Sequence, residues 1–386
     1  MRRAILASAT PHREDRLFPG DIKQFTTGGL NLAYGAAGVL YALAVTGAGR
    51  YAEHEEWLLR RAADPDPAPR LGFYDGLHGV AYVLDRLGHR SDALKLLGLC
   101  VDELRGSLDH FRMDLYGGLA GIGLNLLHFW TATGDSALRD EAFRITEILA
   151  DRLGDEESVG TVSGGEHPYA GLLRGSSGPA LLFLRLYEET GNGALLDLAA
   201  IALRQDLRRC VLRPEGDLQV NEGWRTMPYL TDGSVGIGFV LDDYLTHRQD
   251  ERFAEAAAAI RRAAEGRFYV EPGLFYGRAG MILYLSRTLA PGAGGRDPVV
   301  ASHIRRLGWH ALAYRGDLAF PGEQLLRLSM DLASGTAGVL LALGAALHDS
   351  PIELPFLGPH LRTEEHAGGA VHLAPAGVAH PTDERR

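Results

Sequence analysis

Apolar and charged segments alternate along most of this chain. Apolar runs such as Gly38–Ala44, Ile122–Trp130 and Val339–Leu347 alternate with runs whose charges fall on one face, such as Ser136–Arg152 and Glu251–Arg267. The first kind is typical of a helix buried on all sides, and the second of an amphipathic helix with one face in the core. Strand signals are sparse. The pattern therefore predicts an all-α fold in which buried helices alternate with half-exposed ones.

A Gly-x-x-Gly turn begins each buried helix. The turn occurs seven times, and the spacing between successive first glycines ranges from 41 to 58 residues. The first glycines are Gly35, Gly76, Gly118, Gly175, Gly233, Gly277 and Gly335. A period of this size is the signature of one supersecondary unit repeated along the chain. The repeats run from Tyr34 to Leu347 without a linker, which predicts one domain despite the length of 386 residues.

These repeats predict a closed (α/α) toroid, with seven buried helices as an inner ring and the amphipathic helices as an outer ring. An open solenoid is the alternative, but it needs polar caps and the last repeat is as apolar as the others. Seven inner helices leave six gaps along the chain, and each gap holds one outer helix. The outer helix that closes the toroid must therefore come from residues 1–27 or from outside this chain. Residues 1–27 are otherwise expected to be a lead-in segment, residues 28–359 the toroid, and residues 360–386 a disordered tail.

The turns are expected to converge at one end of the toroid. Glycine would let the backbones approach closely there, and the helix N-termini would direct free N–H groups at one mouth of a central cavity. The three longest repeats carry their extra residues directly before a turn, at Gly154–Leu173, Val211–Thr231 and Ala313–Ala333. All three insertions would lie over the same mouth, and long loops gathered on one face are typical of a binding site.

Composition narrows the function classes. The formal net charge of −10 argues against nucleic acid or an anionic membrane surface as the main partner. Cys100 and Cys210 give no disulfide framework; they are expected on outer helices of a cytoplasmic protein. Leu30–Gly49 has no charged residue and is long enough to span a membrane. The regular alternation with charged segments instead favours buried helices of a soluble protein.

Seven Gly-x-x-Gly helix starts on an (α/α) toroid resemble the LanC-like family of lanthionine synthetase cyclases. The resemblance covers about Leu17 to Pro359, and Asp15–Asp21 and Met330–Gly335 resemble the cyclase domain of class III lanthipeptide synthetases. It implies Michael addition of cysteine thiols to dehydroalanine or dehydrobutyrine in a dehydrated precursor peptide, giving lanthionine or labionin rings. It also implies kinase and lyase domains as partners, because no kinase signature occurs in this sequence.

The sequence departs from the zinc-dependent members of that family. They carry Trp-Cys-Tyr-Gly at the fifth turn and Cys-His-Gly at the sixth, where this chain has Leu-Thr-Asp-Gly and Phe-Tyr-Gly. The residues at the three ligand positions, Thr231, Phe275 and Tyr276, do not make a zinc site. The resemblance to class III domains, which lack these ligands, implies a cyclase without zinc or another cofactor.

Candidate catalytic residues lie beside the turns. Asp114 matches the family's catalytic aspartate and would act as a base or cap the third turn. Arg174 stands where zinc-dependent members place a histidine, and would stabilise a thiolate or enolate or form a structural ion pair. His78 is a candidate proton relay or a packing residue. Tyr276 is a candidate proton donor or a structural aromatic residue.

Further residues beside or before the turns are candidates for substrate binding. They are Tyr116, His167, Tyr169, Asp232, Arg278 and Asp331. The aspartates are also suited to cap helix N-termini. A rearranged metal site from His78, Asp114 and His167 is a further alternative. Two other functions stay open, a non-catalytic module that holds the precursor peptide and a carbohydrate-active toroid with two facing carboxylates.

Overall fold

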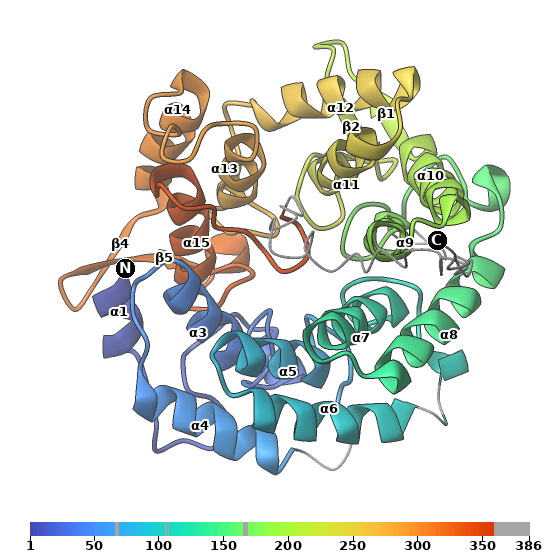
Figure 1. Cartoon of the computed structure of the whole chain (residues 1–386). Coiled ribbons are helices and arrows are strands. Elements are labelled where there is room, and N and C mark those ends of the chain that lie inside the picture. Colours follow the sequence, from blue (N-terminus) through green and yellow to red (C-terminus); the bar gives the residue numbers. More distant parts are fainter. Residues whose placement is uncertain (66–68, 105, 107, 165–168, 359–386) are drawn as a thin grey trace, which may run out of the picture.

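The computed structural model is a ring of helices in two layers (Figure 1). It describes residues 1–358 apart from 66–68, 105, 107 and 165–168, so the expected tail at 360–386 and His167 lie outside the described residues. The inner helices are α3 (Ala36–Val45), α5 (Leu77–Arg86), α7 (Leu119–Thr133), α9 (Ser177–Thr190), α11 (Ser234–His247), α13 (Arg278–Ser286) and α15 (Thr336–Leu347). The outer helices are α4 (Ala52–Ala63), α6 (Arg90–Leu104), α8 (Ser136–Leu153), α10 (Gly193–Arg208), α12 (Glu251–Ala264) and α14 (Pro298–Leu307).

The two helix types form for the reasons that their sequences indicate. Inner helices such as α9 bury nearly every side chain of their first ten residues, whereas α12 buries one face and exposes its charges. Four outer helices begin at an Asp or Asn whose side chain accepts a backbone N–H of the first turn. These N-caps are Asp135, Asn192, Asp250 and Asp297. The predicted toroid with seven Gly-x-x-Gly inner helices is confirmed.

The ring is closed by contacts between its first and last helices. The last inner helix, α15, packs against both α13 and α3. The short α1 (Arg2–Ala7) lies against α15 and β5 (Asp317–Pro321), so residues 1–27 do contribute to the closing outer position. In that segment Ala4, Ile5, Leu17 and Phe18 are buried, which makes the expected lead-in part of the core.

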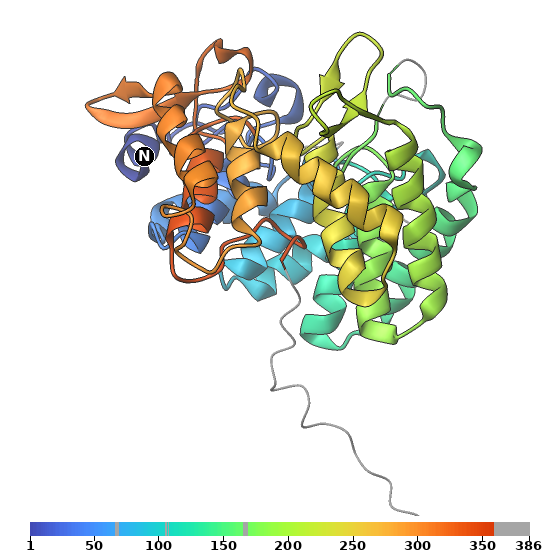
Figure 2. The ribbon, with the colours of Figure 1, turned by 90° about the horizontal axis from the view of Figure 1, so that it is seen from above.

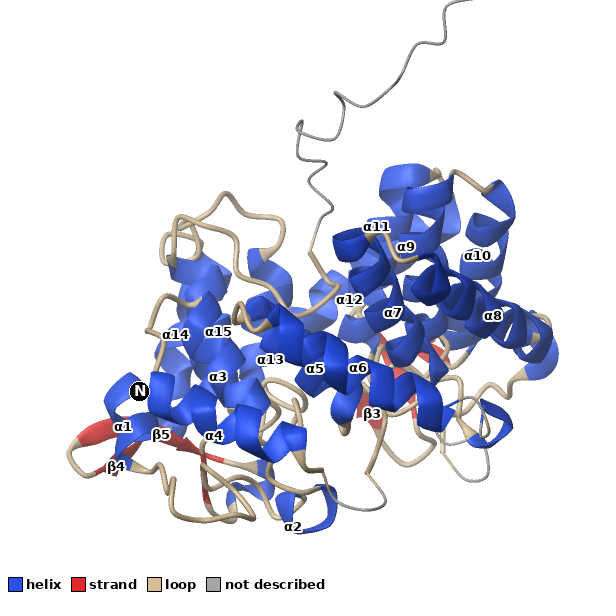
Figure 3. Ribbon diagram, turned by 60° about the horizontal axis from the view of Figure 1, so that its bottom comes forward, coloured by secondary structure: helices blue, strands red, loops and turns tan. Residues whose placement is uncertain are grey.

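Two small antiparallel sheets occupy the second and third insertions, at the same end of the toroid (Figures 2 and 3). One has the order β1 (Cys210–Leu212), β2 (Leu218–Asn221), β3 (Thr226–Met227), and the other β4 (Leu312–Tyr314), β5, β6 (Leu328–Ser329). In register, Val211 faces Gln219 and Ala313 faces Leu318. The sequence did not predict these strands. Cys210 therefore begins β1 instead of lying on an outer helix.

A closed ring of backbone hydrogen bonds joins the seven turns. In each turn, the residue two positions before the first glycine donates its N–H to the carbonyl of the equivalent residue in the next turn, with N···O distances of 2.8–3.4 Å. In order, these residues are Ala33, Tyr74, Tyr116, Leu173, Thr231, Phe275 and Ala333, and then Ala33 again. One backbone bond per repeat thus fixes every turn relative to both of its neighbours.

The second glycine of each turn allows this close approach. A Cβ atom added there would lie 2.7–3.2 Å from the Cβ of a residue in the preceding turn, in all seven repeats. At Gly121, for example, it would lie 2.7 Å from Phe73 Cβ and 2.3 Å from the Leu115 carbonyl oxygen. Any side chain at these positions would push neighbouring turns apart, so the repeated glycine follows from the hydrogen-bonded ring.

The helix N-termini do not direct free N–H groups at the cavity, contrary to the expectation from sequence. The N–H of Ala36 donates to the Gly29 carbonyl and that of Leu119 to the Arg112 carbonyl, both at 2.8 Å. In the fourth turn, the carboxylate of Asp206 accepts the N–H groups of Gly171, Ser176 and Ser177. These N–H groups are therefore already bonded within the chain.

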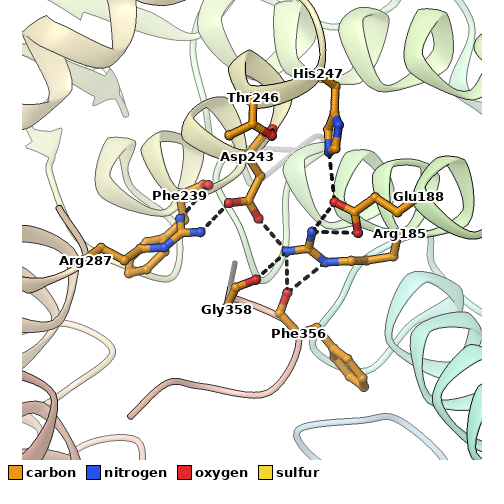
Figure 4. Close-up of polar contacts among 9 residues, drawn as sticks. All are labelled: Arg185, Glu188, Phe239, Asp243, Thr246, His247, Arg287, Phe356 and Gly358. Atoms are coloured by element: carbon orange, nitrogen blue, oxygen red, sulfur yellow. Dashed lines mark hydrogen bonds and ion pairs between the residues drawn. The ribbon is translucent and has the colours of Figure 1, made fainter. Parts of the chain in front are cut away.

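The opposite end of the toroid is covered by residues 351–358. Arg185 donates hydrogen bonds to the carbonyls of Phe356 (2.9 and 3.2 Å) and Gly358 (3.2 Å) (Figure 4). Its guanidinium also pairs with Asp243 at 2.5 Å, and Arg287 binds the other oxygen of that carboxylate. The Phe356 ring packs against Phe73, with centroids 4.8 Å apart. A cavity of about 430 Å³ lies beside the segment.

None of the helices in the described residues combines the length and apolar character that a membrane span requires. The charge-free stretch at Leu30–Gly49 instead contains α3, which is buried by its neighbours in the ring. This agrees with the interpretation of the apolar runs as inner helices.

We expect Gly121→Ala to lower the free energy of unfolding by about 2 kcal/mol or more, because the methyl group has no space between the second and third turns. The measurement is urea unfolding followed by circular dichroism. Gly98→Ala on α6 is the control, since its Cβ would meet open space; it should stabilise by about 0.5–1 kcal/mol. Equal effects of the two substitutions on stability would contradict the conclusion that the hydrogen-bonded turns need glycine at this position.

Replacing Arg185 with Met should lower the free energy of unfolding by about 3 kcal/mol, because it leaves buried carboxylates and two carbonyls without their partner. Arg139→Met is the matched control. Its ion pair with Asp140 is exposed, and its loss should change stability by less than about 1 kcal/mol. A similarly small change at Arg185 would show that the segment is not held by this network.

Candidate functional site

The hydrogen-bonded ring places one residue from each repeat at the mouth of the toroid. The residue two positions before each first glycine belongs to the ring of backbone hydrogen bonds. The residue immediately before each first glycine is therefore held at the same level along the toroid axis in every repeat. These residues are Tyr34, Asp75, Gly117, Arg174, Asp232, Tyr276 and Ser334. Most of them are ionisable, so the ring concentrates polar chemistry at this end.

Asp232 and Tyr276 form the centre of this cluster. They precede α11 and α13 in neighbouring repeats, and the Thr231 N–H to Phe275 carbonyl bond of 3.4 Å fixes their turns side by side. The Tyr276 hydroxyl donates a short hydrogen bond to Asp232 Oδ2. Asp232 is only 5% exposed, and its Oδ1 is buried without a hydrogen-bond partner. One carboxylate oxygen is therefore held by tyrosine and the other is left available.

Burial controls the ionisation of this pair. It raises the pKa of Asp232, and the charge of Arg174 and the Tyr276 hydrogen bond oppose that rise. Burial, reinforced by the Asp232 charge, raises the pKa of Tyr276 well above its ordinary value, so the phenol stays protonated. In this pair, Asp232 is therefore a proton acceptor of raised basicity, and Tyr276 is a neutral proton donor hydrogen-bonded to it.

Arg174 supplies a permanent positive charge beside the pair. Its guanidinium lies over the rings of Tyr116 and Tyr169, 5.0 Å from each centroid. Burial lowers the pKa of Arg174, but the negative charge of Asp232 and the nearby tyrosines outweigh that effect and raise it overall. Of the residues proposed from sequence, the structure thus brings together Arg174, Tyr276, Asp232, Tyr116 and Tyr169.

Lys23 is a residue of this site that the sequence analysis missed. Its Nζ lies 5.5 Å from the Tyr276 ring centroid and 2.5 Å from Glu323 Oε2. The N-terminal segment reaches the site because the Asp21 N–H donates to Asp331 Oδ2 at 2.8 Å. The sequence signal that could have pointed to Lys23 is the neighbouring Asp15–Asp21 stretch, which resembles class III domains.

Asp331 and Asp114 both serve as turn caps. The Asp331 carboxylate accepts hydrogen bonds from the N–H groups of Ser334 and Gly335 as well as from Asp21. Asp114 accepts the Gly117 N–H at 2.9 Å and pairs with Arg112 at 2.7 Å. Burial raises the pKa of Asp114, while Arg112 and then the third-turn N–H groups and Arg174 lower it. Asp114 therefore borders the cluster and can influence Arg174.

Two predicted residues lie apart from the cluster. His78 is fully buried, and its Nδ1 pairs with Asn125 Nδ2 at 3.0 Å between α5 and α7. Burial lowers the pKa of His78 to about 3, so the ring is neutral. Arg278 binds His303 Nδ1 at 3.1 Å and the Arg267 carbonyl at 3.3 Å, on the side of α14. His167 lies outside the described residues.

The residues at the family's zinc-ligand positions do not fit a zinc ion. The Thr231 hydroxyl faces the Phe275 carbonyl at 3.5 Å, Phe275 has no donor atom, and the Tyr276 hydroxyl binds Asp232. Within the part of the chain that the structure describes, no three His, Cys, Asp or Glu side chains are grouped to hold a metal. Cys100 is buried with its pKa raised to about 12, and neither cysteine forms a disulfide.

Comparison with known proteins agrees with this architecture. The chain is 56% identical over 365 residues, 94% of its length, to the probable SapB synthase of Streptomyces coelicolor. The nisin cyclase structure superposes with a TM-score of 0.59 and 16% identity, covering 82% of this chain and 88% of that one. The chain therefore has the fold of nisin cyclase. The resemblance inferred from the turns is thus confirmed, although no family model matches. The chain spans 39% of the length of the SapB synthase.

The buried state of His78 predicts a pH dependence of stability. Its pKa is about 3 in the folded chain and 6.5 when free, so the unfolded state binds more protons between these values and stability falls as pH is lowered through that range. At about pH 5, His78 should lower the free energy of unfolding by about 2 kcal/mol relative to its value at pH 8.

Urea unfolding at both pH values measures this effect. Between pH 8 and pH 5, the free energy of unfolding should fall by about 2 kcal/mol less in His78→Gln than in the parent protein, because the titrating group is gone. His12→Gln at an exposed position is the control and should leave the loss unchanged. An unchanged loss in His78→Gln would mean that His78 is not a buried neutral histidine.

Proposed function

We propose that this LanC-like chain catalyses the intramolecular Michael addition of cysteine thiols to dehydroalanine or dehydrobutyrine in a dehydrated precursor peptide. The products would be lanthionine or labionin rings, formed without zinc as in class III cyclase domains. The observation that carries the proposal is the buried Asp232–Tyr276 pair beside Arg174. It stands at the turns where zinc-dependent relatives place their metal ligands.

The first requirement is a thiolate. A free thiol with a pKa of about 8.5 is only slightly ionised at neutral pH, so a base must take its proton. Asp232 is suited to this because burial raises its pKa and its Oδ1 has no other hydrogen-bond partner. The thiol proton passes to Asp232, and the sulfur is left as the nucleophile.

The second requirement is stabilisation of the charge that moves onto the substrate. When sulfur bonds to the β-carbon, the carbon–carbon double bond breaks and negative charge collects on the carbonyl oxygen as an enolate. Arg174 and Lys23 supply positive charge near this position, and Tyr116 and Tyr169 hold the Arg174 guanidinium between their rings. Fixed charges in a buried site stabilise such an enolate more than water does.

The third requirement is a proton for the α-carbon. Tyr276 is neutral because its pKa is raised, and its hydroxyl is hydrogen-bonded to Asp232. It donates its proton to the α-carbon and regains from Asp232 the proton that came from the thiol. The net result is one proton moved from sulfur to carbon, and the site returns to its starting state. Asp114 supports the site by fixing Arg112 and the third turn, and stays a candidate second base.

The wider setting follows from the same proposal. The dehydrated precursor would come from kinase and lyase domains, on this polypeptide or another. We place the reaction in the cytoplasm because both cysteines are free thiols. The alternative is a non-catalytic module that binds the precursor peptide for those partner domains.

Substituting the central pair separates these functions. We expect Tyr276→Phe and Asp232→Asn each to lower kcat for ring closure by about 100-fold with little change in KM, because proton transfer is lost while binding is kept. The assay follows disappearance of the free thiol in a synthetic peptide bearing one cysteine and one dehydroalanine. Tyr41→Phe is the control, since it also removes a buried hydroxyl bond, to Glu353 at the opposite end. Unchanged ring closure in both site variants would leave the binding module as the better account.

A further inference from the structure

Seven large apolar side chains near the candidate site are exposed to solvent. They come from the N-terminal segment and from the segments that precede the sixth and seventh turns, and we call them the apolar arc. They are Ile22 (55% exposed), Phe25 (69%), Phe268 (72%), Val270 (53%), Trp309 (64%), Leu325 (43%) and Leu326 (66%). Isolated exposed apolar residues are common in proteins, but a contiguous group indicates an interaction surface.

Two hydrogen bonds and an ion pair join the segments of the arc to one another. The His310 ring bonds to the Val270 carbonyl at 2.8 Å, which links the Trp309 segment to the one before the sixth turn. The Gln324 N–H donates to Glu271 at 2.9 Å, and Glu323 pairs with Lys23 at 2.5 Å. These contacts place the segments that carry the arc beside one another, from the Trp309 segment to the N-terminal segment.

The backbone at the middle of the arc is strained. Gln324 and Leu325 have φ values of 54° and 60°, in the left-handed region that side chains other than glycine rarely adopt. This turn leaves Leu325 and Leu326 facing solvent, where they contribute nothing to the core. Strain of this kind is found where a loop has a binding or catalytic role.

The arc carries positive charge in an otherwise acidic protein. Arg16 and Arg327 lie over the Phe25 ring at 6.0 and 5.5 Å, and Arg306 lies over Trp309 at 5.8 Å. None of these three guanidinium groups has a carboxylate at ion-pair distance among the residues that the structure describes. The nearby carboxylates are already engaged, Glu323 by Lys23 and Glu271 by the Gln324 N–H.

We propose that the apolar arc binds an extended, acidic and apolar segment of the precursor peptide, next to the residues that become joined. Continuity with the site favours this partner, because Lys23 belongs to the same segment as Phe25 and lies against Tyr276. The free arginines match carboxylates on the peptide, and the exposed rings and leucines match its apolar side chains. The inference rests on the proposed function for the identity of the peptide.

Binding of a designed peptide tests the surface without turnover. The probe is a short fluorescein-labelled peptide of Leu, Glu, Gly and Ser, and its partner probe has Lys in place of every Glu. Fluorescence anisotropy should show affinity for the acidic probe at least about tenfold higher than for the basic one. The double substitution Phe25→Ser with Leu326→Ser should weaken acidic-probe binding by about tenfold or more.

Leu99→Ser is the matched control. Leu99 is 55% exposed on α6, outside the arc, and its replacement should leave the affinity unchanged. Equal affinity for the two probes, or equal effects of the arc and control variants, would overturn the proposal. So would a dimer in sedimentation that the arc variant abolishes, because the occupant would then be a second copy. If the protein binds the acidic probe through the arc but does not close rings, the proposed catalysis is wrong and the proposed role of the arc still holds.

Discussion

The seven-membered ring of backbone hydrogen bonds is the constraint on which the rest of this structure depends. Each repeat contributes one N–H and one carbonyl, and the last bond runs from Ala333 to Ala33, so no repeat can shift without breaking bonds to two neighbours. The second glycines are needed because neighbouring turns approach within contact distance. The site follows as a geometric consequence, since the residues next to the ring are carried to one mouth of the toroid.

The two ends of the toroid use buried charge differently. At the far end, Arg185 is saturated by carboxylates and by the carbonyls of residues 356 and 358, an arrangement that fixes a segment in place. At the mouth, Asp232 keeps an unpartnered oxygen and Arg174 rests on aromatic rings. Groups with unused hydrogen-bonding capacity in a buried setting are suited to chemistry, and fully paired groups are suited to stability.

The repeat, the closed toroid and the position of the mouth could be predicted because they rest on periodic signals of ten or more residues. The strands of two to five residues carry no such signal, and the segment that carries Lys23 is held at the site by a contact across 310 positions, between Asp21 and Asp331. In the sequence, His78 is a candidate proton relay, and Asp232 is a candidate only for substrate binding or helix capping. Asp232 precedes its first glycine and meets the mouth, whereas His78 follows its glycine and is packed between helices.

Ring closure by the metal-free protein tests whether side chains at the mouth take the place of zinc. The protein would be treated with a chelator, dialysed, and shown by mass spectrometry to hold zinc well below one ion per chain. If so, thiol consumption in a dehydroalanine peptide should continue at the untreated rate, and added zinc should not raise it. Activity that is lost on chelation and restored by zinc would contradict it, and the residues at the fifth and sixth turns would have to be reinterpreted.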